Sequence, residues 1–131
     1  GKENDVWVDE VIERLDLTDK ASTNMRKLSG GMKRRALIAQ ALVHKPPVIV
    51  LDEPTAAIDA RAEAEIFSHF QDLTAKRIAI IISHRFSTVR MADHIIVLEK
   101  GKISERGSHA ELIENEGQYS VLFNLQAQGY R

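Results

Sequence analysis

The sequence contains no cysteine, and its 131 residues include only three prolines and 5% aromatic residues. Without cysteine the chain forms no disulfides and uses no thiolate chemistry, which fits a reducing compartment. The longest apolar runs, "RIAIIIS" and "HIIVLE", are far shorter than the roughly 20 residues that a membrane helix needs. The first residues, "GKENDVWVDE", are polar and acidic, unlike a signal peptide. We therefore expect the isolated chain to be soluble.

A strong charge of either sign is also missing, because the formal net charge is −1. We therefore expect no nucleic-acid partner and no broad attraction to an anionic membrane. Hydrophobic residues make up 44% and charged residues 28% of the chain, which favours a folded globular protein over a disordered one. The length fits a single domain over residues 1–131, with a helical portion at 1–45 and a strand-containing portion at 46–131.

Apolar periodicity predicts that helices and strands alternate, which indicates an α/β fold with a mainly parallel sheet. "VIVLD" and "RIAIIIS" are apolar, β-branched runs typical of strands buried on both faces. Ser29 is a good N-cap, and "SHAE" from Ser108 is a capping box that opens a short helix. Gly101 supplies the turn of a hairpin over 94–107. Other helices are predicted over residues 5–15, 31–43, 60–73, 86–91 and 119–128, and 16–27 is read as a polar connector.

Two acids, Asp52 and Glu53, directly follow the first predicted strand. Open α/β sheets bind their ligands at the carboxyl ends of their strands. A carboxylate at Asp52 can hold Mg²⁺ through water, because Mg²⁺ prefers oxygen ligands and keeps several waters. The adjacent Glu53 points the other way and can activate a water for attack on phosphorus. The alternative is that the strand simply ends in two solvated acids.

One of the five histidines, His84 in "IIISHR", stands at the end of the second predicted strand. There it can donate a hydrogen bond to a phosphate oxygen or position a water. We expect its strand to lie beside the one that ends in Asp52. The remaining histidines are read as structural: His44, His69, His94 and His109.

The stretch "KLSGGMKRR" places Ser29, Gly30 and Gly31 at the start of a predicted helix. The free backbone N–H groups and the positive dipole end of such a helix attract anions. A serine hydroxyl adds a donor, and the missing Cβ atoms let a phosphate approach. The alternative is a capped helix with a glycine-rich start and no ligand.

These elements, in this order and spacing, resemble the second half of an ATP-binding cassette (ABC) ATPase domain. "LSGG" resembles the signature motif of that family, "VIVLDEP" its Walker B strand, "TAAID" its D-loop and "IISHR" its switch-histidine loop. The resemblance is strong over residues 28–131 and looser over the opening helix. It implies part of a P-loop NTPase (RecA-like) core, preceded by a helical signature subdomain and followed by a β-hairpin and helices.

The resemblance also implies a role for each matching residue. Asp52 would hold Mg²⁺ through water, Glu53 would be the general base and His84 would contact the γ-phosphate of ATP. Asp59, in the D-loop, would signal across a dimer interface.

In the same comparison, Ser29, Gly30 and Gly31 would close over the γ-phosphate of a nucleotide bound mainly by another subunit. The implied partners are a second nucleotide-binding domain and the transmembrane domain of a transporter. The parent protein would place this domain in the cytoplasm, at the inner face of the membrane.

Met32 departs from the family pattern, in which the signature continues with Gln. Family members that act as ABC-2-type exporters also read "LSGGMKRR", whereas "ISHRFSTVRMADHIIVLEKGKI" and "YSVLFNLQAQGYR" resemble exporters fused to membrane helices. A chimera of the two branches is one explanation, and borrowing of features within a large family is the other.

A larger departure is that no "GxxxxGK[ST]" phosphate loop occurs in the sequence. Without its amides and lysine, most of the usual binding energy for the β- and γ-phosphates is missing. We expect the isolated chain to bind ATP weakly and to be inactive unless a Walker A half complements it. In the fold it resembles, the phosphate-loop strand lies between the strands of "RIAIIIS" and "HIIVL". Those strands would leave apolar edges open, or would close together in a rearranged domain.

Three hypotheses follow. The first is an ABC ATPase portion whose parent couples ATP hydrolysis to transport. The second is a non-catalytic folded module, either chimeric or engineered. The third is a lobe of a DNA-repair or chromosome-maintenance ABC ATPase, which the transporter-like "EKGKISERGSHAELI" and the lack of a heptad run disfavour.

Overall fold

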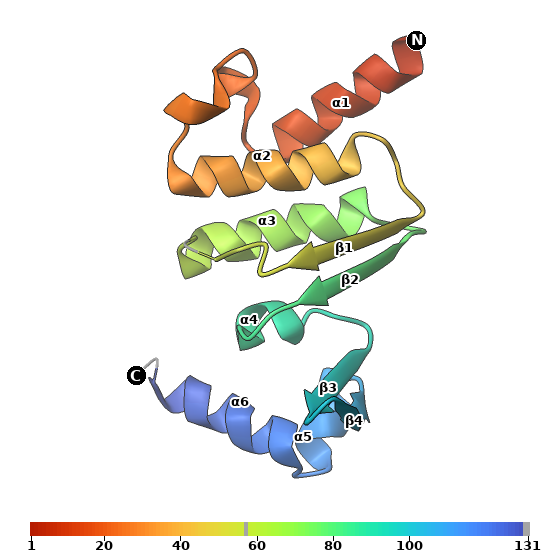
Figure 1. Ribbon diagram of the computed structural model, residues 1–131, viewed down its shortest axis with the longest axis vertical. Coiled ribbons are helices and arrows are strands. Elements are labelled where there is room, and N and C mark those ends of the chain that lie inside the picture. Colours follow the sequence, from red (N-terminus) through yellow and green to blue (C-terminus); the bar gives the residue numbers. More distant parts are fainter. Residues whose placement is uncertain (57, 130–131) are drawn as a thin grey trace. The chain divides into compact units, whose positions relative to one another are not determined.

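The computed structural model describes residues 1–56 and 58–129, and the chain divides into two compact units, Gly1–Ile82 and Ser83–Arg131. The first unit contains α1 (Lys2–Arg14), α2 (Gly30–Leu42), β1 (Val48–Asp52), α3 (Ala60–Leu73) and β2 (Ile78–Ile82) (Figure 1). The second contains α4 (Phe86–Val89), β3 (Ile95–Glu99), β4 (Lys102–Gly107), α5 (His109–Glu114) and α6 (Gln118–Gly129). No helix among these described residues is long and apolar enough to cross a membrane.

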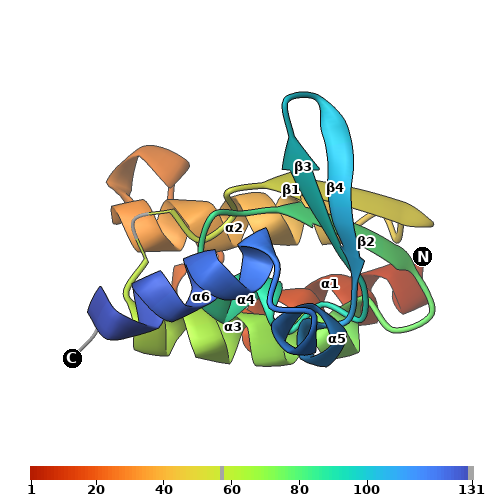
Figure 2. The same cartoon turned by 90° about the horizontal axis from the view of Figure 1, so that it is seen from below.

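The predicted α/β fold is confirmed, although its strands form two small sheets. In the first unit, β1 and β2 pair in parallel, with Val48 opposite Ile78 and Asp52 opposite Ile82. Helix α3 connects them and lies along one face of the pair, as the two views in Figures 1 and 2 agree. Such a strand–helix–strand crossover is the standard way to join parallel neighbours. The second sheet is the antiparallel hairpin β3–β4.

Only one face of the β1–β2 pair is covered, so the prediction that both strands are buried on both faces is wrong. On the covered face, Ile49 is 3% exposed. Side chains on the other face are 47% to 61% exposed, and they are Val48, Val50, Ile78, Ile80 and Ile82. We call these five residues the open sheet face. The apolar sequences of β1 and β2 are typical of strands with both faces covered. Among the described residues, a helix covers only one face of the pair.

Helix α1 begins three residues before the predicted start and is attached to the rest of its unit by Trp7. The Trp7 indole N–H donates to the carbonyl of Leu42 at 3.1 Å. The ammonium of Lys45 and the guanidinium of Arg77 lie 5.1 and 4.9 Å from the ring centroid, within the range of cation–π attraction. Trp7 therefore connects α1 with the end of α2 and the start of β2.

The connector between α1 and α2 is more ordered than the sequence suggested. It contains two 3₁₀ turns, Thr18–Lys20 and Met25–Lys27. The side chain of Asn24 caps the second turn by accepting from the Arg26 amide at 2.9 Å. Short polar side chains favour such local bonds, which explains why a stretch without apolar periodicity still adopts regular turns.

The predicted hairpin of the second unit is confirmed, with Glu99 paired to Lys102. Lys100 and Gly101 both have positive φ angles, 51° and 76°. A two-residue hairpin turn in which both residues have positive φ matches the twist of the strands, and glycine adopts this conformation without steric cost.

Helices α5 and α6 begin at well-defined caps. The capping box of α5 is confirmed, because Ser108 and Glu111 exchange side-chain to backbone hydrogen bonds. Glu105 of β4 caps α6, accepting from the amides of Gln118 at 2.6 Å and Tyr119 at 3.3 Å. The core of this unit is a cluster of Ile95, Leu112 and Tyr119, with Phe86, Val89, Val97 and Ile113 packed against it.

Candidate functional site

The N-terminus of α2 carries the predicted anion-binding residues. Ser29 is the N-cap, and its Oγ accepts from the Met32 amide at 3.3 Å. Gly30 and Gly31 are the first two helical residues, and neither has a positive φ. A Cβ atom built at Gly30 would meet nothing within 4 Å, and one at Gly31 would meet only Ile58 Cγ1, at 4.0 Å. Neither packing nor backbone conformation among the described residues therefore requires these glycines.

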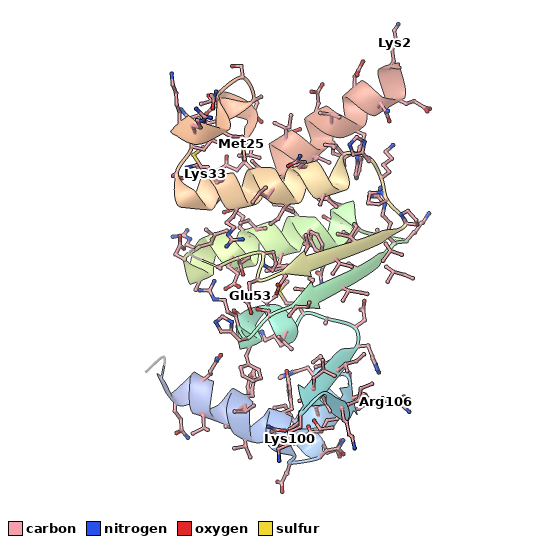
Figure 3. All side chains as sticks on the ribbon, viewed as in Figure 1. Lys2, Met25, Lys33, Glu53, Lys100 and Arg106 are labelled. Atoms are coloured by element: carbon pink, nitrogen blue, oxygen red, sulfur yellow. The ribbon has the colours of Figure 1, made fainter. Side chains whose placement is uncertain are left out.

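The two acids lie at the end of β1, as predicted. Asp52 is exposed on the last position of the strand, and Glu53 is half-buried. The Glu53 amide donates to the carbonyl of Ile82 at 2.8 Å, which extends the strand pairing by one bond. Its φ of 44° turns the chain out of the extended conformation at this residue (Figure 3). Among the described residues, five other non-glycine residues also have positive φ, so this conformation does not by itself mark Glu53 as functional.

Beyond Glu53, the chain is anchored by a buried polar pair that the sequence reasoning missed. Thr55 Oγ1 donates to Glu63 Oε1 at 2.6 Å, and the two residues are 0% and 1% exposed. This distance lies within the usual range of an O–H···O hydrogen bond. A signal was present, because Glu63 precedes Ile66, Phe67 and Phe70 at helical spacings of three, four and seven on the buried side of α3. A charged residue on such a stripe indicates a paired buried group.

Asp59, the predicted signalling residue, has a local structural role. It is the N-cap of α3, accepting from the amides of Arg61 at 3.1 Å and Ala62 at 3.0 Å. The bond from Ala62 is the main cause that holds the pKa of Asp59 below its ordinary value, and the positive charge of Arg35 acts in the same direction. Ala57, within the predicted D-loop "TAAID", lies outside the described residues.

Two observations bring the α2 N-terminus and the 53–59 segment together. Gly31 lies against Ile58, as its built Cβ position shows. Arg35, one turn further along α2, acts electrostatically on Asp59 and also bonds Asp16 at 2.9 Å. The first turns of α2 therefore lie near Ile58 and Asp59, the residues that lead into α3.

His84 belongs to the second unit, whereas Asp52 and Glu53 belong to the first. It is exposed, and its carbonyl accepts from Gln126 Nε2 of α6 at 3.1 Å. The next helix, α4, starts two residues later, at Phe86. The contribution of Gln126 was not anticipated from the sequence.

The described residues contain no cluster of three or more His, Cys, Asp or Glu side chains able to hold a metal by themselves. The exposed carboxylate of Asp52 nevertheless fits Mg²⁺ that arrives with a nucleotide, because such ions are held by one or two carboxylates together with phosphates and water. A surface hollow of about 450 Å³ lies at α1, lined by residues that include Trp7 and Lys45. None of the predicted site residues lines it.

Comparisons with known proteins agree on one family. The family described as "ABC transporter" matches residues 2–56. The chain is 45% identical over 100 residues to an ATP-dependent lipid A-core flippase of Desulfotalea psychrophila, covering 76% of the chain and 18% of that protein. It is 42% identical over 124 residues to the flippase of Pasteurella multocida, covering 93% and 21%.

Among solved structures, the chain is similar to a bacterial Atm1-family ABC exporter with ATP bound. The TM-score is 0.81 and the identity 34%, over 93% of this chain and 23% of that one. The chain thus spans about a fifth of the length of these relatives. The sequence motifs, the fold and these likenesses together place the chain in the ABC transporter family, within the ATPase domain of such proteins.

Proposed function

We propose that the chain supplies the signature, Walker B and switch-histidine elements of an ABC ATPase whose ATP hydrolysis drives export. The observation that carries this proposal is the pair of glycines at the N-terminus of α2, which packing among the described residues does not require. Free N–H groups at such a helix start attract a phosphate. The two acids at the end of β1 supply the oxygen ligands that a metal ion bound to a nucleotide prefers.

In this proposal, Asp52 holds Mg²⁺ through water and Glu53 is the general base. Mg²⁺ would supply neutralisation of charge on the phosphates. His84 contacts the γ-phosphate, and Asp59 communicates with the neighbouring ATPase domain while it caps α3.

Ser29, Gly30 and Gly31 contact the γ-phosphate of a nucleotide held mainly by a second ATPase domain. Packing among residues 1–56 and 58–129 does not require the two glycines, which supports close approach by an external group. The other partners we propose are a Walker A half and a transmembrane domain at the inner face of the membrane. The parent protein would be an exporter similar to the lipid A-core flippases.

The open sheet face supports a need for complementation. Five apolar side chains on β1 and β2 are about half exposed, although their strands read as fully buried ones. Because the sequence has no "GxxxxGK[ST]" loop, the chain alone should bind Mg·ATP weakly and hydrolyse it negligibly. Calorimetry of the pure chain with Mg·ATP tests this, and tight Mg²⁺-dependent binding would contradict it.

The decisive experiment adds a Walker A half taken from a lipid A-core flippase and measures ATP hydrolysis. We expect hydrolysis from the mixture that neither part gives alone. Glu53→Gln should abolish it, whereas Glu65→Gln, an exposed substitution on α3, should not. A well-folded mixture without hydrolysis would favour the non-catalytic module, which should unfold cooperatively with a midpoint that ATP does not change.

A further inference from the structure

One side chain of α6, that of Gln126, bonds to the backbone next to His84. Gln126 donates from Nε2 to the His84 carbonyl at 3.1 Å and accepts at Oε1 from the Phe86 amide at 3.4 Å. The two bonds require this orientation of the amide, because the flipped one would put oxygen against carbonyl and N–H against N–H. Gln126 therefore contacts peptide groups on both sides of Arg85.

The second of these bonds gives an acceptor to the backbone amide at the start of α4. Phe86 is the first residue of α4, and its amide is one of the donors that a helix start leaves without an intrahelical partner. The N-cap residue is Arg85, whose side chain has only donors and so cannot cap. Gln126, 40 residues later in the sequence, supplies the acceptor instead.

A cap and aromatic packing fix the position of α6, which carries Gln126. Its start is fixed by Glu105, which accepts from the amides of both of the first two residues. Along the same side of the helix, Tyr119 and Phe123 pack edge-on against Phe86, with ring centroids 5.4 and 5.5 Å apart. Gln126 follows Phe123 by three residues, so it continues the same face.

We propose that Gln126 is a positioning residue that fixes the backbone of His84 for its contact with the γ-phosphate; this inference rests on the function proposed above for His84. The direction in which a side chain leaves the backbone is set by the flanking peptide groups, and Gln126 fixes the one that follows His84. Displacements of about 1 Å at such a contact are costly for catalysis. Gln126 does not touch the nucleotide and acts only through His84.

The first test uses the chain alone and measures amide hydrogen exchange by NMR. Gln126→Met keeps the length and helix propensity of the side chain but removes both bonds. The Phe86 amide should then exchange roughly 2- to 12-fold faster, as expected for the loss of one neutral hydrogen bond. The Leu112 amide, which donates to the Ser108 carbonyl at 3.1 Å within α5, should be unchanged.

Two further variants sharpen this test. Gln126→Glu keeps an acceptor for Phe86 but places a carboxylate oxygen against the His84 carbonyl. It should leave Phe86 protected and shift the His84 backbone resonances. Gln128→Met, at an exposed position two residues later, should change neither. Unchanged exchange at Phe86 in Gln126→Met, or equal acceleration at Leu112, would overturn the positioning role.

The second test uses the complemented ATPase. Gln126→Met should lower kcat by roughly 10-fold or more while KM for ATP stays within about 2-fold, because the loss falls on the transition state. An active complex with unchanged kcat would refute the inference. If His84→Ala leaves hydrolysis intact, the proposed role of His84 fails instead, and the exchange data still decide whether Gln126 holds the backbone.

Discussion

Replacing Gly30 and Gly31 with alanine tests whether these glycines serve something outside the chain. Both lie in the first turn of α2 with ordinary helical φ angles. The added methyl at Gly30 would meet open space, and that at Gly31 would only touch Ile58 at 4.0 Å. Because the alanines introduce no clash, the double variant should be more stable than the parent chain.

The size of the gain follows from backbone entropy. Gly→Ala at a compatible site stabilises by about 0.4–1 kcal/mol, mainly by restricting the unfolded chain. The two changes together should add about 1–2 kcal/mol to the free energy of unfolding. Urea unfolding monitored by fluorescence of Trp7, the single tryptophan, measures this in the first unit. With an m-value of about 2 kcal/mol/M, the midpoint should rise by about 0.5–1 M.

The same double variant should lose activity in the complemented ATPase. The methyl groups would stand between the helix amides and an approaching phosphate, and each charge-assisted hydrogen bond lost is worth about 1.5–3 kcal/mol. We expect kcat/KM to fall by roughly 10- to 100-fold. Gly129→Ala, also at an open helical position, is the matched control and should leave kcat/KM unchanged. Loss of stability, or full activity with the alanines present, would refute the reasoning.

Three other changes test separate parts of the structure. Thr55→Val removes a hydrogen bond to a buried carboxylate and should lower the free energy of unfolding by about 1.5–3 kcal/mol in urea titrations. The control Thr55→Ser removes only one methyl group and should cost less, roughly 0.8 kcal/mol. Burial raises the pKa of the Tyr119 hydroxyl. The stabilisation from the neutral hydroxyl is therefore present below pH about 10 and is lost above it. Tyr119→Phe should flatten the fall in thermal midpoint between pH 9 and 11. Changing Val50 and Ile80 to threonine should raise the soluble concentration limit measured by light scattering, since both are exposed.

The elements that could be predicted are those whose signals lie in a few neighbouring residues. Apolar periodicity and the caps Ser29 and Ser108 fix where α2 and α5 begin. The two-residue Lys100–Gly101 turn fixes the pairing next to it, Glu99 with Lys102 and Leu98 with Ile103, and the register shifts between Val97 and Leu98. Local chemistry decides these features, so one sequence is enough to read them.

The features that escaped prediction depend on contacts between distant residues. Gln126 bonds to Phe86, 40 residues earlier in the sequence, and no local sequence pattern around Gln126 predicts this contact. An apolar run specifies a strand but not how many layers cover it, which is why the exposure of Val50 and Ile80 was missed. The bond from the Glu53 amide to the Ile82 carbonyl likewise joins residues far apart in the sequence.

The open sheet face and the proposed chemistry meet at Asp52. Paired residues of parallel strands share a face, and side chains alternate along a strand, so Asp52 continues the series of Val48 and Val50. The carboxylate proposed to hold Mg²⁺ therefore stands at the border of the apolar surface. Any segment that covers this surface also lowers the dielectric around Asp52 and strengthens its attraction to a cation. Covering the open sheet face and preparing the metal site are, on this geometry, the same event.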